Sequence, residues 1–251
     1  MSQDYVNSYE GGVGRVITQG MRVNKTAQET ILGTIRNLAV GRQIVYAKIG
    51  AAAISAASLC QMKTAGTSFA VVPCNATASI GAKMVSLKVT AALTKDQMKD
   101  GFLVVHCGTG TGYSYMIDYH LSAAATDLAC NFTLKDGLEV ALTTASICSL
   151  VQNKYSGVVV AQAGGQTNPL VGVGLCTGSI NSFSWLGKKG PFLCVTDSLA
   201  VTAGKEVTVG CAAGTINMAR SAEDTVLPSI GIAMQSAAAN SAARIMVDLD
   251  L

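Results

Sequence analysis

The chain has 251 residues, of which 49% are hydrophobic and 13% are charged, with a formal net charge of +3. This composition excludes a mainly disordered chain and supplies enough apolar material for one large domain or two small ones. No apolar stretch reaches the roughly 18 residues of a membrane-spanning helix, and the start lacks the basic flank and apolar run of a secretory signal. We therefore expect synthesis in the cytoplasm and no membrane partner.

The positive charge is concentrated at the beginning of the chain. The first 50 residues hold six basic groups and three acids, whereas the rest of the chain holds twelve of each. A nucleic-acid-binding surface would need clustered Lys and Arg side chains, so we expect no nucleic-acid partner. Two interpretations stay open, namely an arm that touches an acidic protein surface and an ordinary solvated face.

Residues 1–50 are predicted to form an extended N-terminal arm. Their first part is rich in Gly and polar residues and shows no steady period. Thr26 and Glu29 have the spacing of a capping box, which predicts a short helix, although Gly33 weakens it. Because this segment cannot bury a core of its own, we expect it to contact the rest of the fold or a neighbouring subunit.

The remaining chain carries the pattern of an all-β protein, in which short apolar runs alternate with Gly, Asn and Asp turns. We predict a mainly β fold with little helix, built as a β-barrel or a tulip-like sandwich. The β body spans residues 51–163, and a looser stretch introduces a second β region, 164–251, packed on the first. One helical turn is expected at 94–97, where Thr and Gln have capping-box spacing. The predicted strands are 69–72, 84–89, 102–105, 113–119, 130–134, 147–151, 158–160, 170–176, 192–195, 207–209, 230–234 and 244–249.

The eight cysteines are scattered along the chain, mostly in apolar runs. None belongs to a Cys-x-x-Cys pair, and no histidine stands at metal-ligand spacing from one of them. Buried free thiols behave as small hydrophobic groups. We therefore expect free thiols and no metal site, and thiol contacts between subunits stay open.

No set of residues predicts catalysis. A Ser–His–Asp combination of Ser114, Asp118 and either His106 or His120 lacks the Gly-x-Ser-x-Gly frame of a nucleophile. The glycines of 108–112 precede a predicted strand rather than the helix of a phosphate-binding loop, so they indicate a hairpin connection. We expect no enzymatic activity and no cofactor.

The aromatic residues allow two interpretations. Trp185, the single tryptophan, either anchors an interface or fills the core of the second β region. Together with Tyr113, Tyr115 and Tyr119 it also forms the one aromatic set that a glycan-binding module would use.

Several short motifs follow one another in a characteristic order. A small-residue Gly-Arg step comes after the arm, a Gly–strand–Gly-rich turn–Tyr strand unit lies in the middle, and an apolar-Gly-apolar-Ala strand lies near the end. With a turn before an exit strand and two closing β elements, these stretches are 39–45, 101–105, 108–117, 153–158, 190–194, 204–209 and 230–234. In this order of motifs the chain resembles the head decoration, or cement, proteins of tailed bacteriophages.

The resemblance implies a structural role on the outside of a virion. Such proteins bind the capsid exterior, often as homotrimers, and bridge neighbouring major capsid subunits, with the arm lying along the shell. The arginines of segment 5–45 are then candidates to bind carboxylates of the shell protein. The residues predicted to make capsid or inter-subunit contacts are Tyr5, Arg15, Arg22, Arg36, Arg42 and Trp185. The alternatives are another phage structural β protein, from a tail, fibre or baseplate, and a glycan-binding module.

Overall fold

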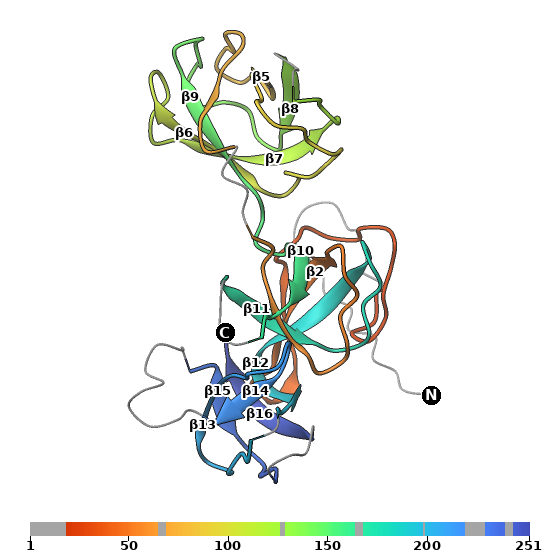
Figure 1. The fold of residues 1–251 in the computed structure, drawn as a ribbon. Helices are drawn as coiled ribbons and strands as arrows, with labels where there is room; N and C mark the ends of the chain where they lie inside the picture. Colours follow the sequence, from red (N-terminus) through yellow and green to blue (C-terminus); the bar gives the residue numbers. More distant parts are fainter. Residues whose placement is uncertain are drawn as a thin grey trace. The chain divides into compact units, whose positions relative to one another are not determined.

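The fold is described by a computed structural model, which covers residues 19–64, 69–125, 129–163, 168–197, 199–218, 229–238 and 243–251. In these ranges the chain forms sixteen strands and one short 3-10 turn, so the predicted mainly β fold with little helix is confirmed. No helix in the same ranges is long and apolar enough to cross a membrane. The chain divides into two compact units (Figure 1). Unit 1 contains residues 1–63 and 154–251, and unit 2 contains residues 64–153.

Unit 1 is built from both ends of the chain. Its elements are β1 (Ile35–Asn37), η1 (Ala39–Gly41), β2 (Gln43–Ile49), β3 (Leu59–Gln61), β10 (Ser156–Val160), β11 (Leu170–Gly174), β12 (Phe183–Val195), β13 (Glu206–Val209), β14 (Ile216–Met218), β15 (Gly231–Ala233) and β16 (Arg244–Asp250).

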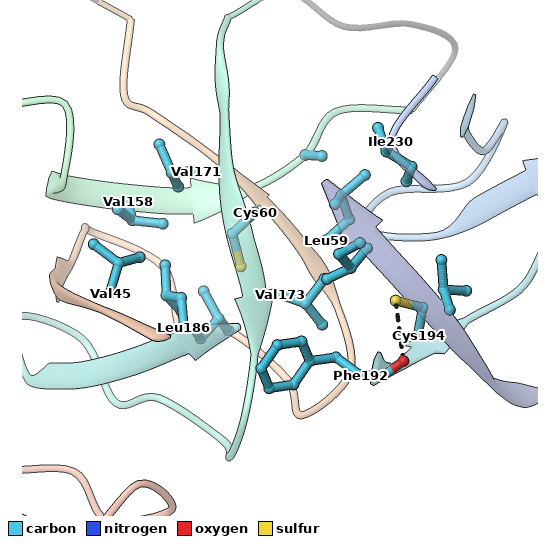
Figure 2. Close-up of a cluster of buried hydrophobic side chains, with 14 of the residues drawn as sticks. Val45, Leu59, Cys60, Val158, Val171, Val173, Leu186, Phe192, Cys194 and Ile230 are labelled. Atoms are coloured by element: carbon cyan, nitrogen blue, oxygen red, sulfur yellow. Dashed lines mark hydrogen bonds between the residues drawn. The ribbon is translucent and has the colours of Figure 1, made fainter. Parts of the chain in front are cut away.

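Five of these strands close into a barrel-like ring. The pairs run from β2 to β10, β3, β11 and β12, and β12 pairs again with β2. Closure leaves no unpaired edge within the ring. Val45 and Leu186 are register partners, and Figure 2 shows both with Val158 in the core. All three side chains are fully buried, so aliphatic contacts hold the ring together.

The long strand β12 connects two parts of one ten-stranded sheet. Its first half pairs with β2, and its second half pairs with β16, which is followed by β15, β13 and β14. A further bridge joins Thr196, just after β12, to Ile216 of β14, so the last strand of this series, β14, lies next to the end of its first strand, β12. A Cβ at Gly187 would lie 2.7 Å from the ring of Phe192, so only glycine permits the close packing at this transition.

Unit 2 is a single barrel-like sheet of six short strands. The order is β4-β9-β6-β7-β8-β5, and the bridge between Cys74 and Leu87 joins the two outer strands. Its strands are β4 (Val72–Pro73), β5 (Met84–Leu87), β6 (Phe102–Cys107), β7 (Ser114–His120), β8 (Cys130–Leu134) and β9 (Ile147–Val151). The fully buried side chains of Leu103, Ile117 and Phe132 lie in its core.

A reciprocal backbone pair recurs in the loops of both units. Four pairs of residues each exchange two N–H···O bonds of 2.8–3.0 Å outside the named strands. The pairs are Ile54 with Gly178 and Val201 with Ala237 in unit 1, and Ala78 with Leu142 and Leu93 with Ala123 in unit 2. These are backbone contacts, but a local sequence accompanies them, because six of the eight residues are followed directly by Ser or Thr. In five of those six cases the residue three positions later has a positive φ, namely Ala57, Gly81, Asp96, Asn181 and Gly204.

The predicted boundaries differ from those of the structure. Unit 2 begins at residue 64 and ends at 153, whereas the sequence placed boundaries after 50 and 163. Hydrophobic alternation marks strands but not their partners, so it did not show that the chain returns to unit 1 to form β10.

The described part of the predicted arm is also different from expectation. Residues 35–37 and 43–49 are strands of unit 1. Side chains on both faces of β2 are buried, and Tyr46 is fully buried. The helix predicted after Thr26 is absent, because the chain instead pairs as β1 with β2 and Gly33 adopts a φ of 91°. Residues 1–18 lie outside the described ranges. At 94–97 the expected capping contact is present in a turn, where Thr94 N–H donates to Gln97 Oε1 over 3.1 Å.

Candidate functional site

Three arginines that are far apart in the sequence line one hollow on unit 1. Arg22 comes from the segment before β1, Arg42 directly precedes β2, and Arg244 begins β16. The hollow has a volume of about 400 Å³, and none of the described residues that line it is Asp or Glu. Its walls include the apolar side chains of Leu175 and Leu193. The arrangement combines positive charge with an apolar floor.

The charges of this arginine hollow are not neutralised by any acid in the described ranges. The ion pairs found there join Lys25 to Glu29, Lys135 to Asp100 and Lys189 to Asp250, and none involves Arg22, Arg42 or Arg244. Arg42 Nε makes one long hydrogen bond to Ala39 O, at 3.5 Å. Guanidinium groups in this state bind carboxylates through paired, charge-assisted hydrogen bonds.

The segment that carries Arg22 is held on β12 by a small polar network. Gln19 Nε2 donates to Phe183 O over 2.8 Å and to Val23 O over 2.6 Å. Lys25 and Phe183 exchange two backbone hydrogen bonds of 3.1 and 2.7 Å. The Tyr46 hydroxyl donates to Gln19 Oε1 over 3.1 Å. These bonds fix the chain on both sides of Arg22 and so place it at the hollow.

An exposed apolar row extends from the floor of the hollow across strands β12, β16 and β15 of unit 1. Leu193 of β12 is the register partner of Met246 of β16, and Met234 N–H donates to Met246 O over 2.9 Å. The exposed fractions are 42% for Leu193 and 54% for Met234, and the nearby Ile232 is 50% exposed. At its far end the row is bordered by acids, because Ile232 is the register partner of the exposed residues Glu206 and Asp248. Exposed apolar side chains next to arginines are a feature of protein–protein interfaces.

The structure brings together two of the residues predicted to make contacts at the surface and buries two others. Arg22 and Arg42 meet at the hollow, where Arg244 joins them. Arg36 is instead buried, 7% exposed, with its guanidinium carbon 4.6 Å from the centre of the Trp185 ring. The prediction of a surface contact for these two residues is therefore corrected.

Trp185 is a core residue of unit 1, also packed against Tyr46 at a ring distance of 5.0 Å. Trp185 of β12 and Tyr46 of β2 are register partners, so their side chains lie on the same face of the sheet. Tyr5 and Arg15 lie outside the described ranges.

Arg244 and the apolar row were missed by the sequence interpretation. The strand around Arg244 shows clear alternation, with Ile245 and Val247 buried and Met246 half-buried. That signal identifies which side chains share a face, but it does not identify the neighbouring strands that complete a surface.

The two histidines take different positions in unit 2. His106 is exposed on β6, and its Nδ1 lies 3.0 Å from Ser149 Oγ. Ser149 Oγ donates its proton to Ala70 O over 2.6 Å, so His106 is the donor in that pair and does not activate the serine. His120 is fully buried in the core, where burial lowers its pKa. Ser114 and Asp118 are both exposed, and among the described residues no hydrogen bond joins either side chain to a histidine.

Tyr113 and Tyr115 stack at a ring distance of 6.3 Å in unit 2, whereas Trp185 is buried in unit 1, so the four aromatics do not form one surface cluster. Among the described residues, no three His, Cys, Asp or Glu side chains gather as metal ligands.

Comparisons with protein-family models, with curated proteins and with solved structures gave no match for this chain.

Proposed function

We propose that this chain is a structural protein of a virion, which binds the outer surface of a phage capsid and stabilises it by bridging major capsid subunits, as a homotrimer. The observation that carries the proposal is the arginine hollow with its apolar floor and the exposed apolar row beside it. The order of motifs in the sequence, which resembles that of phage decoration proteins, gives the proposal its biological setting.

The hollow fits a segment of a capsid protein that presents carboxylates next to apolar side chains. Carboxylates would pair with Arg22, Arg42 and Arg244, and the apolar groups would cover Leu193 and Met246. A protein–protein interface of ordinary size buries about 1,200–2,000 Å². Contacts repeated over a closed shell add avidity, so a moderate affinity at each site is sufficient for stable attachment.

The proposal is tested by reversing charge in the hollow. Arg42→Glu combined with Arg244→Glu should lower the affinity for purified shells by at least about 100-fold, because each of the two lost charge-assisted contacts costs roughly 1.5–3 kcal/mol. The control combines Lys88→Glu with Lys95→Glu, which makes the same total charge change at two exposed residues of unit 2 that do not line the hollow. Co-sedimentation of protein with shells, at low and at high salt, measures the affinity.

Three outcomes decide between the possibilities. The hollow is supported as the contact site if binding is lost only in the variant with Arg42→Glu and Arg244→Glu, and if salt weakens the binding of the unaltered protein. Equal binding by all variants rejects the hollow, and absence of binding by the unaltered protein rejects a capsid role. Counting copies in the native particle adds a separate check, because hundreds of copies indicate the shell and a handful indicate the tail.

A further inference from the structure

Two buried cysteines of unit 2 are in contact with each other. The sulfurs of Cys74 and Cys148 are 3.8 Å apart, and the exposed fractions of these residues are 1% and 0%. A disulfide bond is about 2.05 Å long, so the sulfurs need to move together by less than about 2 Å. Side-chain rotation about χ1 is on the scale of such a displacement. The two thiols therefore lie near bonding distance without a bond between them.

The pair lies at the point where the barrel of unit 2 closes. Cys74 bridges Leu87, with flanking bonds from Asn75 N–H to Ser86 O (2.8 Å) and from Lys88 N–H to Pro73 O (2.9 Å). On its other side, Cys74 N–H donates to Ser146 O over 3.0 Å, next to β9. A covalent link to Cys148 would join β4, the strand that closes the barrel against β5, to its other neighbour β9, and we call this β4–β9 pairing the seam.

This seam is also the place in unit 2 where opening is easiest. β4 pairs with β9 through Val72 and Pro73 alone, which is the shortest strand pairing among the described residues of the unit. Pro73 has no backbone N–H to add to the ladder. Short pairings open locally at low free-energy cost, which gives a small reagent access to both sulfurs.

The contact distinguishes these thiols from the other buried cysteines. With Cys148 as the donor, the shared S–H···S hydrogen bond lowers the pKa of Cys74 and raises that of Cys148, and burial acts upward on both. Burial raises the pKa of Cys60 and of Cys194 in unit 1 to about 12, in Cys60 against the lowering effect of a hydrogen bond with the Gly174 backbone. Cys74 is therefore the better nucleophile, because thiolates and not thiols attack disulfides.

We propose that Cys74 and Cys148 are a latent disulfide pair, which a small organic disulfide converts into a cross-link across the seam of unit 2. The Cys74 thiolate attacks one sulfur of the reagent, whose S–S bond breaks and releases one thiolate. Cys148 then loses its proton to water and attacks the Cys74 sulfur, and the second thiolate leaves. The protein loses two electrons, and the reagent gains them as two thiols. This inference does not depend on the proposed function.

The test treats the reduced full-length protein with oxidised glutathione, both in buffer and in urea below the unfolding transition. Free thiols are then alkylated after unfolding, and the digest is analysed by mass spectrometry. We expect one linked peptide pair, 74 with 148, and a higher urea midpoint for hydrogen exchange in unit 2. Cys148→Ser should abolish both changes. Cys107→Ser removes an exposed thiol of the same unit, and should keep them.

The result that overturns the proposal is equally specific. If Cys74 and Cys148 are alkylated in both conditions to the same extent as in untreated protein, the pair is not a disulfide site. Linkage of either residue to a different cysteine has the same consequence. A link that forms in urea but not in buffer supports the proposal and shows that opening of the seam limits the rate.

Discussion

The two units have similar sheets but differ in where their charged and polar side chains lie. Both are closed, barrel-like sheets of short strands with aliphatic cores. In unit 1, arginines stand at the surface without an acidic partner in the described ranges, around the hollow. In unit 2, a nearly buried Asp100 is paired with Lys135 at 2.7 Å, and a histidine and two contacting thiols lie in the core. Unit 1 thus exposes arginines without a paired acid around the hollow, whereas unit 2 holds an ion pair, a histidine and two contacting thiols in its interior.

The largest loss of stability is expected when one buried aromatic side chain is removed from each unit. Trp185→Ala should destabilise unit 1 by about 3–5 kcal/mol, and Phe132→Ala should do the same to unit 2, because each leaves a large cavity. Hydrogen exchange followed by mass spectrometry reports each unit separately. Loss of protection in both units after a single substitution would contradict their description as separate cores.

Breaking one ion pair in each unit tests whether the buried pair of unit 2 contributes more stability than the exposed pair of unit 1. Asp100→Asn should cost unit 2 about 2–3 kcal/mol, because it leaves the partly buried Lys135 ammonium without its carboxylate. Asparagine tolerates the φ of 59° at this position, so the backbone is preserved. Asp250→Asn in unit 1 should cost less than about 1 kcal/mol, since its pair with Lys189 is exposed. Urea unfolding measures both, and similar costs would remove the contrast.

A smaller effect is expected from pH, and it should be confined to unit 2, which holds both histidines of the chain. His120 Nδ1–H donates to Leu121 O over 2.7 Å, and Nε2 accepts Met98 N–H over 2.9 Å, which requires the neutral ring. Burial lowers the pKa of His120 from 6.5, against the opposing effects of Leu121 O and Asp96.

Because the unfolded chain takes up this proton more readily than the folded one, the contribution of His120 is complete above about pH 6.5. It decreases as the pH falls from there toward the folded pKa. Hydrogen exchange in unit 2 should therefore accelerate between pH 7 and pH 5, after correction for intrinsic rates. His120→Gln should reduce this dependence, and His106→Gln should preserve it. An unchanged profile in His120→Gln would assign the effect to other groups.

The sequence by itself determined where many strands lie. The runs predicted at 130–134 and 147–151 are β8 and β9, with the same ends. Alternation is local information, because side chains of a strand point to opposite faces in turn. It failed for β2, which is covered on both faces and shows no alternation. It also found only the end of β12, whose middle carries Gly187 and Gly190.

The tertiary structure alone decided what those strands build. Arg22, Arg42 and Arg244 converge from both ends of the chain because β2, β12 and β16 are neighbours in the sheet. Cys74 and Cys148 touch because β4 and β9 pair, and nothing in their spacing indicates it. Strand partners are chosen by the packing of the whole core, so contacts between distant residues follow from closure of the barrels and not from local pattern.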